Sequence, residues 1–146
     1  MNLSEHFTLE ELTASQEAVR RGIDNTPLPS VIGELKATAS RMEEIRGVLG
    51  HPIVVSSGYR SAELNAAIGG SANSAHCRGR AVDFTCPGFG TPLEVCRKLR
   101  AALPEYDQII FEGAWVHVGF DPSMRRQELT AVFKKGEKTT YEEGFA

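Results

Sequence analysis

Two histidines and one aspartate stand out in this sequence as residues that together could bind a metal. His76 precedes a short glycine-containing turn, Asp83 lies in the apolar run 81–84, and His117 lies in the apolar stretch 115–120. A carboxylate on an apolar strand is costly unless a cation or hydrogen bonds compensate it. Two imidazoles and one carboxylate, with a fourth position open to water, form the ligand set of a catalytic zinc site. The sequence therefore predicts that His76, Asp83 and His117 bind Zn2+.

Strand alternation explains how these side chains would meet. The side chains of a β-strand alternate between its two faces. In residues 81–84 and 115–120 the alternation places most of the apolar side chains on one face and Asp83 or His117 on the other. If the two strands are neighbours, their apolar faces form one core and His117 projects beside Asp83. His76, one turn upstream, is then close enough to share the same cation.

Each of these residues also has a simpler reading. A lone histidine in a strand is more often a hydrogen-bonded core residue than a metal ligand, and Asp83 alone could cap a turn or pair with Arg80. Cys77 is an alternative ligand beside His76, but neighbours in an extended loop generally point apart. We expect all three cysteines to be structural thiols, namely Cys77, Cys86 and Cys96. The joint pattern favours the metal site.

Three blocks of the sequence resemble one protein family. The pattern Ser-x-His-x-x-Gly-x-Ala-x-Asp at residues 74–83, followed by Trp-Val-His at 115–117, is similar to the signature of the M15 metallopeptidases, which include D-alanyl-D-alanine carboxypeptidases and phage endolysins. The block Ser-Gly-Tyr-Arg-Ser at 57–61 resembles an upstream block of the same family. The blocks occur in the expected order across residues 53–120. The resemblance implies the D-alanyl-D-alanine peptidase fold, which hedgehog signalling domains share.

Arg60, Ser74 and Trp115 are the candidate substrate-binding residues. With zinc in place, bound water would titrate near pH ~7 instead of ~15.7, and its attack on an amide carbonyl makes an oxyanion that a nearby cation stabilises. Arg60 is the candidate cation, because the N–H groups of its planar guanidinium can hydrogen-bond to a carbonyl or a carboxylate. The alternative is that Arg60 forms a structural ion pair. The resemblance places Arg60 in the family's substrate-binding block and implies that Ser74 hydrogen-bonds to substrate. Trp115 lines the cleft or supports the neighbouring ligand.

The general acid/base is the position at which the sequence departs from the family pattern. A group must take the water proton and deliver it to the leaving amine. Many members of the family carry an acidic residue three positions before the last histidine ligand, and here that position is Ala114. Glu112 is the nearest upstream carboxylate, and it precedes a Gly-Ala connection that could turn it back to the metal. We predict Glu112 as this group, with Asp107 as a poorer alternative because it lies further away.

Composition and charge restrict the class of protein. At 146 residues, with 41% hydrophobic and 24% charged residues, the chain is expected to be one globular metallopeptidase domain. Its net charge of −3 gives no electrostatic case for binding nucleic acid or an anionic membrane. No apolar run approaches the ~20 residues that span a bilayer, and residues 1–7 lack a secretory signal. We expect a monomer, made in the cytoplasm, that meets the cell wall after phage-type release or within a virion.

The hydrophobic periodicity predicts an α+β fold with a small, largely antiparallel sheet and flanking helices. Residues 1–50 are expected to be helical in two places, after a capping box at Thr8 and along an apolar stripe over 29–49. Residues 51–133 form the expected zinc-site core, and residues 134–146 a charged, loosely ordered tail. Within the core, a buried strand is predicted at 53–55, and further strands are predicted at 81–84, 107–112, 115–120 and 129–133. Helices are predicted at 62–67 and at 92–103, and Thr91 is the expected N-cap of the second of these helices.

Two functions are compatible with these features. The first is a zinc-dependent peptidase that hydrolyses an amide bond in peptidoglycan stem peptides, either as an endolysin-like endopeptidase or as a D,D-carboxypeptidase. The second is a non-catalytic zinc-binding structural or attachment domain of a phage particle, which the missing acid at Ala114 favours. A serine or cysteine hydrolase built on Ser57 or Cys77 lacks the sequence pattern of a nucleophile elbow.

Overall fold

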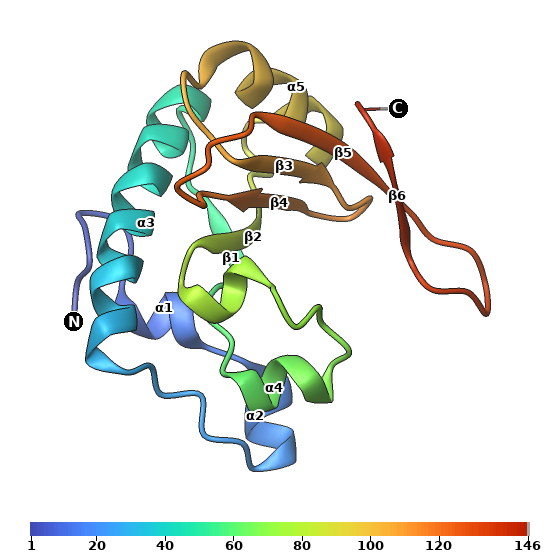
Figure 1. The fold of residues 1–146 in the computed structure, drawn as a ribbon. Helices are drawn as coiled ribbons and strands as arrows, with labels where there is room; N and C mark the ends of the chain where they lie inside the picture. The colour runs from blue at the N-terminus through green and yellow to red at the C-terminus, as the bar shows by residue number, and fades with distance from the viewer. Residues whose placement is uncertain (146) are drawn as a thin grey trace. The chain divides into compact units, whose positions relative to one another are not determined.

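The computed structural model describes residues 1–145, which form helices and one six-stranded sheet (Figure 1). The helices are α1 (Leu9–Thr13), α2 (Gln16–Arg21), α3 (Pro29–Leu49), α4 (Ala62–Ala67), the 3₁₀ turn η1 (Ala75–Arg78) and α5 (Pro92–Ala102). The strands are β1 (Val54–Ser57), β2 (Ala81–Thr85), β3 (Gln108–Phe111), β4 (Val116–Gly119), β5 (Gln127–Val132) and β6 (Thr140–Glu143). The predicted α+β class is confirmed.

The sheet is mostly antiparallel, as the sequence predicts. Its strands follow the order β1-β2-β4-β3-β5-β6, so the Asp83 strand β2 and the His117 strand β4 are neighbours as predicted. Strand β3 runs antiparallel to β4, with Ile110 opposite His117, and parallel to β5. Strand β5 pairs antiparallel with β6, with Ala131 opposite Tyr141. The hairpin of β3 and β4 therefore lies between β2 and the C-terminal strands.

Two compact units each have an apolar core. Unit 1 comprises Met1–Glu44 and Val55–Val82, and unit 2 comprises Ile45–Val54 and the chain from Asp83 onward. In unit 1, the apolar core includes the almost fully buried residues Leu12 of α1, Leu35, Ala39 and Met42 of α3, and Leu64 of α4. In unit 2, α5 contacts β3 and β4, and the buried residues include Val95, Cys96, Leu99, Ile109, Val116 and Val118. The chain passes between the units within α3, β1 and β2.

Local sequence accounts for most of the helix ends. Helices α1 and α5 begin at the predicted threonine N-caps Thr8 and Thr91, each with a glutamate three residues later that completes a capping box. No helix was predicted at α2, although Ser15 caps its start and Gly22, with a φ of 67°, ends it in the left-handed region. None of the helices within residues 1–145 has both the length and the apolar character needed to cross a membrane.

Two expectations about strands were wrong. Residues 53–55 were predicted as a buried strand, but β1 lies at the edge of the sheet and Val54 is 54% exposed. The segment after Lys134 was predicted to be loosely ordered, but residues 140–143 form β6 on the other edge. Threonine and tyrosine favour strands, and Gly136, with a φ of 78°, lies in the reversal that brings β6 back to β5.

Candidate metal centre

The 3₁₀ turn η1 positions His76, and local sequence builds that turn. The Ser74 hydroxyl oxygen caps the turn by accepting a hydrogen bond from the backbone N–H of His76 (3.2 Å). Gly79 ends the turn with a φ of 70°, a conformation that favours glycine. The Gly79 carbonyl oxygen accepts a buried hydrogen bond from the Thr38 hydroxyl of α3 (2.6 Å). The turn is thus held at both ends, and the His76 residue is only 1% exposed.

A backbone carbonyl sets the protonation of the His76 ring. Nδ1 of His76 lies 2.7 Å from the carbonyl oxygen of Gly58. Because a carbonyl oxygen can only accept, Nδ1 must carry the proton, and Nε2 keeps a lone pair for a metal. Gly58 has no room for a side chain, since an added Cβ would collide with the carbonyl oxygen of Leu12. The glycine of the 57–61 block therefore allows the close packing that places this carbonyl.

Strands β2 and β4 supply the other two predicted ligands. The alternation on β2 buries Val82 and Phe84 fully, and Asp83 between them is partly exposed. On β4 the apolar residues are buried in the same way, and the His117 side chain is 12% exposed. Nδ1 of His117 lies 2.9 Å from Oδ1 of Asp83. The predicted alternation is therefore confirmed on both strands.

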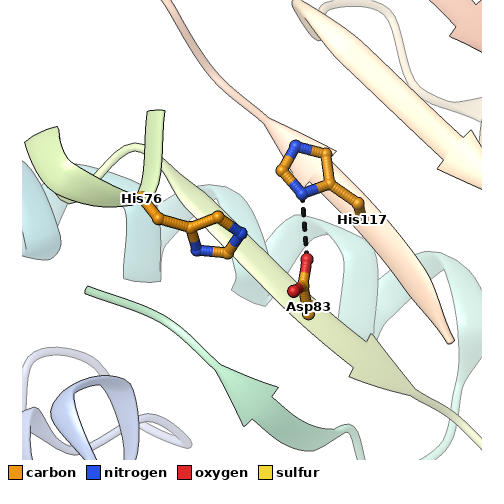
Figure 2. A group of neighbouring side chains, drawn as sticks. All are labelled: His76, Asp83 and His117. Carbon is orange, nitrogen blue, oxygen red and sulfur yellow. Dashed lines mark hydrogen bonds and ion pairs between the residues drawn. The ribbon is translucent and has the colours of Figure 1, made fainter. Parts of the chain in front are cut away.

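The three predicted ligands come together in the structure. His76, Asp83 and His117 each offer one ligand atom, and these atoms all lie within 4.8 Å of one another. Figure 2 shows the His76 ring directed toward the paired Asp83 and His117 side chains. Within residues 1–145, no other group of at least three His, Cys, Asp or Glu residues could hold a metal. Two imidazoles and one carboxylate fit a divalent ion such as zinc.

The cysteines lie outside this group. Burial raises the pKa of the Cys77 thiol, and the positive charges of Arg60 and Arg78 only partly oppose this effect. Burial raises the pKa of Cys96 further, to about 12. Because only the thiolate is a good ligand or nucleophile, a thiol that stays protonated suits the structural role predicted for these residues.

Arg60 is tied to the His76 turn through the backbone. Its N–H donates a hydrogen bond to the carbonyl oxygen of His76 (3.1 Å). The same segment is held by Asn25, whose amide donates to the Tyr59 carbonyl oxygen (3.1 Å) and accepts from the Ser61 N–H (2.7 Å). The role of Asn25 was not predicted from the sequence, because an asparagine among prolines signals only a turn. Its structural task becomes visible only when the two distant segments are seen together.

The β3–β4 hairpin places Glu112 on the face of the sheet that carries His117. Ile110 lies directly opposite His117. Glu112 directly follows β3, and its N–H donates to the Trp115 carbonyl oxygen, so the ladder continues by one residue and alternation points Glu112 to the same side. Diagonal neighbours of this kind are ~7–8 Å apart, within reach of long side chains. Ala114, where an acid was expected, is exposed in the turn. The register therefore puts Glu112 on the same face of the sheet as His117, one diagonal step away.

Trp115 closes the same hairpin. The Glu112 N–H donates a hydrogen bond to the Trp115 carbonyl oxygen (3.0 Å), and Gly113 makes the turn with a φ of 83°. Trp115 is partly buried, and it precedes His117 by two residues, so both side chains point to the same face of the sheet. Its predicted place beside a ligand is compatible with either of the two roles considered for it.

Asp107, the alternative acid, is engaged elsewhere. Its carboxylate accepts hydrogen bonds from the Ser123 hydroxyl (2.8 Å) and from the Arg125 guanidinium (2.9 and 3.0 Å). Burial alone would raise the pKa of Asp107, but these hydrogen bonds hold the pKa below its usual range. Asp107 is thus a buried carboxylate held by Arg125 and Ser123, which leaves Glu112 as the better candidate for proton transfer.

A comparison with protein families finds a match to most of this chain. A family model described as Peptidase M15 matches residues 5–119. A comparison with curated proteins finds no match. The matched segment includes all three predicted ligands and the β3–β4 hairpin, whereas β5 and β6 lie beyond it.

Proposed function

The chain belongs to the M15 peptidase family, and on that premise we propose that it is a zinc-dependent peptidase that hydrolyses an amide bond in peptidoglycan stem peptides. The observation that carries this proposal is the group of His76, Asp83 and His117, whose ligand atoms lie within 4.8 Å of one another. When bound by these residues, zinc supplies an acidified water molecule and a polarised amide carbonyl. The proton on Nδ1 of His76 directs Nε2 to the metal.

Glu112 is the general acid/base of the proposed reaction. Its carboxylate takes a proton from the attacking water and delivers it to the amine that leaves when the amide bond breaks. Its place on the His117 face, one diagonal step from that residue, supports this role. The Gly113 turn that follows Glu112 fixes the backbone of the hairpin end.

Arg60 is the proposed partner of the negative charge on substrate. A guanidinium can stabilise the oxyanion that forms at the attacked carbonyl, or bind a free carboxylate at the end of a peptide. The hydrogen bond from its N–H to the His76 carbonyl oxygen supports this role, because it ties the Arg60 backbone to a predicted ligand. A carboxypeptidase needs the second of these contacts and an endopeptidase needs only the first.

Ser74 and Trp115 are proposed to contact the peptide. The Ser74 hydroxyl accepts from the His76 N–H, and its own proton is available to a substrate carbonyl. Trp115 offers an aromatic surface on the His117 face, and aromatic side chains supply large contact areas in binding sites. Ser74 also caps the His76 turn, and Trp115 also closes the hairpin that follows Glu112. Their contact with substrate is therefore proposed separately from the metal chemistry.

Incubation of purified peptidoglycan with the zinc-loaded protein tests the proposal directly. Mass spectrometry should detect new stem-peptide fragments that are absent when a chelator is present. The fragment masses identify the bond: loss of a terminal D-alanine indicates a carboxypeptidase, and an internal cut indicates an endopeptidase. Unchanged material from several wall chemotypes, with protein shown to carry zinc, would contradict the proposed activity.

One observation favours a second function, a non-catalytic zinc-binding domain of a phage particle. Ala114 occupies the position at which many members of the family carry an acid, and without proton transfer the bound metal alone would be a poor catalyst. This alternative predicts that the protein binds zinc and peptidoglycan without releasing fragments. The same incubation therefore distinguishes the two functions.

A further inference from the structure

Strands β5 and β6 extend beyond the family match and bring one tyrosine to the face of the sheet that carries His117. The β3–β5 register, continued by one residue, places Glu112 level with Ala131, and Ala131 pairs with Tyr141. Residues level with one another on neighbouring strands point to the same side of a sheet. Glu112, Ala131 and Tyr141 therefore form one row on the His117 face.

The residue in the middle of this row has a short side chain. Ala131 ends at Cβ and is 8% exposed, so no bulky side chain of β5 stands between the Glu112 carboxylate and the Tyr141 phenol. Tyr141 itself is 50% exposed. An aromatic ring with a polar tip, half open to solvent, is suited to contact a ligand.

The negative charges of two nearby acidic residues act on Tyr141. Burial, and then the negative charges of Glu112 and Asp83, raise the pKa of Tyr141.

We propose that Tyr141 is a substrate-contacting residue whose phenol O–H donates a hydrogen bond to a backbone carbonyl of the bound peptide. The inference rests on the proposed peptidase function and adds a contact outside the matched residues 5–119. Ionised carboxylates only accept hydrogen bonds, whereas a protonated phenol donates one. Tyr141 thus supplies the donor that Glu112 and Asp83 cannot supply on this face.

The test compares Tyr141→Phe with the wild-type protein, because phenylalanine keeps the ring and removes only the O–H. The probe is a synthetic stem pentapeptide that ends in D-alanyl-D-alanine, incubated with the zinc-loaded proteins. KM should rise about 3- to 10-fold, as expected for one lost hydrogen bond, while kcat changes less than twofold and zinc affinity stays unchanged. Trp115, the one tryptophan of the chain, lies at the same hairpin as Glu112 and reports peptide binding by its fluorescence without any turnover.

Tyr106→Phe is the matched control. Tyr106 is fully buried, and the Arg126 guanidinium lies 4.5 Å from the centre of its ring, so the same loss of an oxygen should leave KM unchanged. A KM and a fluorescence titration for Tyr141→Phe equal to the wild-type values would overturn the inference, as would a loss of zinc. If the wild-type protein binds the peptide without cleaving it, the peptidase function fails while the titration still decides on Tyr141. If it neither binds nor cleaves, both proposals fail.

Discussion

Gly58 shows how a residue without a side chain can control a metal ligand. Its backbone packs against the Leu12 carbonyl at a distance that no other residue tolerates, and its own carbonyl oxygen holds the proton on Nδ1 of His76. Such partners of metal-binding histidines fix both the orientation of the ring and the nitrogen that binds the metal. The Ser-Gly-Tyr-Arg-Ser block is therefore part of the support of His76, in addition to its proposed contact with substrate.

Gly58→Ala should weaken zinc binding. The new methyl group collides with the Leu12 carbonyl, so the segment must shift and the Gly58–His76 hydrogen bond is strained. We expect zinc affinity to fall about 10- to 100-fold and stability by about 1–3 kcal/mol, measured by competition with a chelating dye and by urea unfolding. Gly33→Ala in α3, where an added Cβ meets nothing within 4 Å, is the control and should leave zinc affinity unchanged. Equal zinc affinity in the two variants would contradict the role of Gly58.

Glu112→Gln should separate proton transfer from metal binding. The amide keeps the size of the side chain but cannot carry the proton, so turnover of the stem pentapeptide should fall about 10²- to 10⁴-fold while zinc affinity is retained. The exposed Glu137 in the β5–β6 turn provides the matched control, Glu137→Gln. Activity that survives in Glu112→Gln would move the general base to another residue.

At the scale of elements, the residue before β3 and the segment leading into β5 are joined by an ion pair between the buried Asp107 and the half-exposed Arg125. The Asp107 carboxylate accepts hydrogen bonds from the backbone and side chain of Arg125 (3.1, 3.0 and 2.9 Å) and from Ser123. Met124 and Arg126 have φ values of 42° and 54°, a conformation that is uncommon for residues other than glycine. These contacts hold the segment in place despite that conformation. The segment leads directly into β5, the strand that pairs with β6.

Asp107→Asn should therefore destabilise the protein in a pH-dependent way. The folded state lowers the pKa of Asp107, so its stabilisation is complete above the ordinary carboxyl pKa of about 3.9 and is lost as the pH falls through the lower folded pKa. We expect a loss of about 2 kcal/mol at pH 7, measured by urea unfolding, and a smaller difference from wild type at pH 3. Glu137→Gln controls for the loss of one charge. A difference that is the same at both pH values would contradict this explanation.

At the scale of the whole molecule, the metal should stabilise the folded chain. The predicted ligands are separated in sequence and meet only when the chain is folded, so zinc binds the folded state in preference to the unfolded one. Zinc at 100 times its dissociation constant adds about 2.7 kcal/mol, which corresponds to a rise in Tm of about 5–10 °C. Differential scanning fluorimetry measures this shift.

His76→Ala should abolish the zinc-dependent rise in Tm, because it removes one of three ligands. His51→Ala is the matched control, since His51 lies beside Gly88 and is not one of the three grouped residues. A zinc shift that persists in His76→Ala, or one that disappears in His51→Ala, would place the metal elsewhere.

Features that depend on neighbouring residues were predictable from the sequence. The capping boxes at Thr8 and Thr91 use residues three positions apart, and strand alternation put Asp83 and His117 opposite the apolar faces of their strands. The motif blocks then indicated the family, and the family model supports that assignment. Both kinds of signal are local, because hydrogen bonds at helix ends and alternation along a strand involve short stretches of chain.

Only the tertiary structure decided which distant segments meet. Nothing local reveals that Asn25 holds the backbone at Tyr59 and Ser61, that β3 pairs in parallel with β5, or that the charged tail contains a strand with Tyr141 on the His117 face. The physical reason is that a strand's partner and a loop's anchor are chosen by packing over the whole chain, which local propensity does not encode. The sequence by itself determined the ligand types and the ends of the main helices. The fold determined that Glu112, rather than a residue at position 114, shares the face of His117.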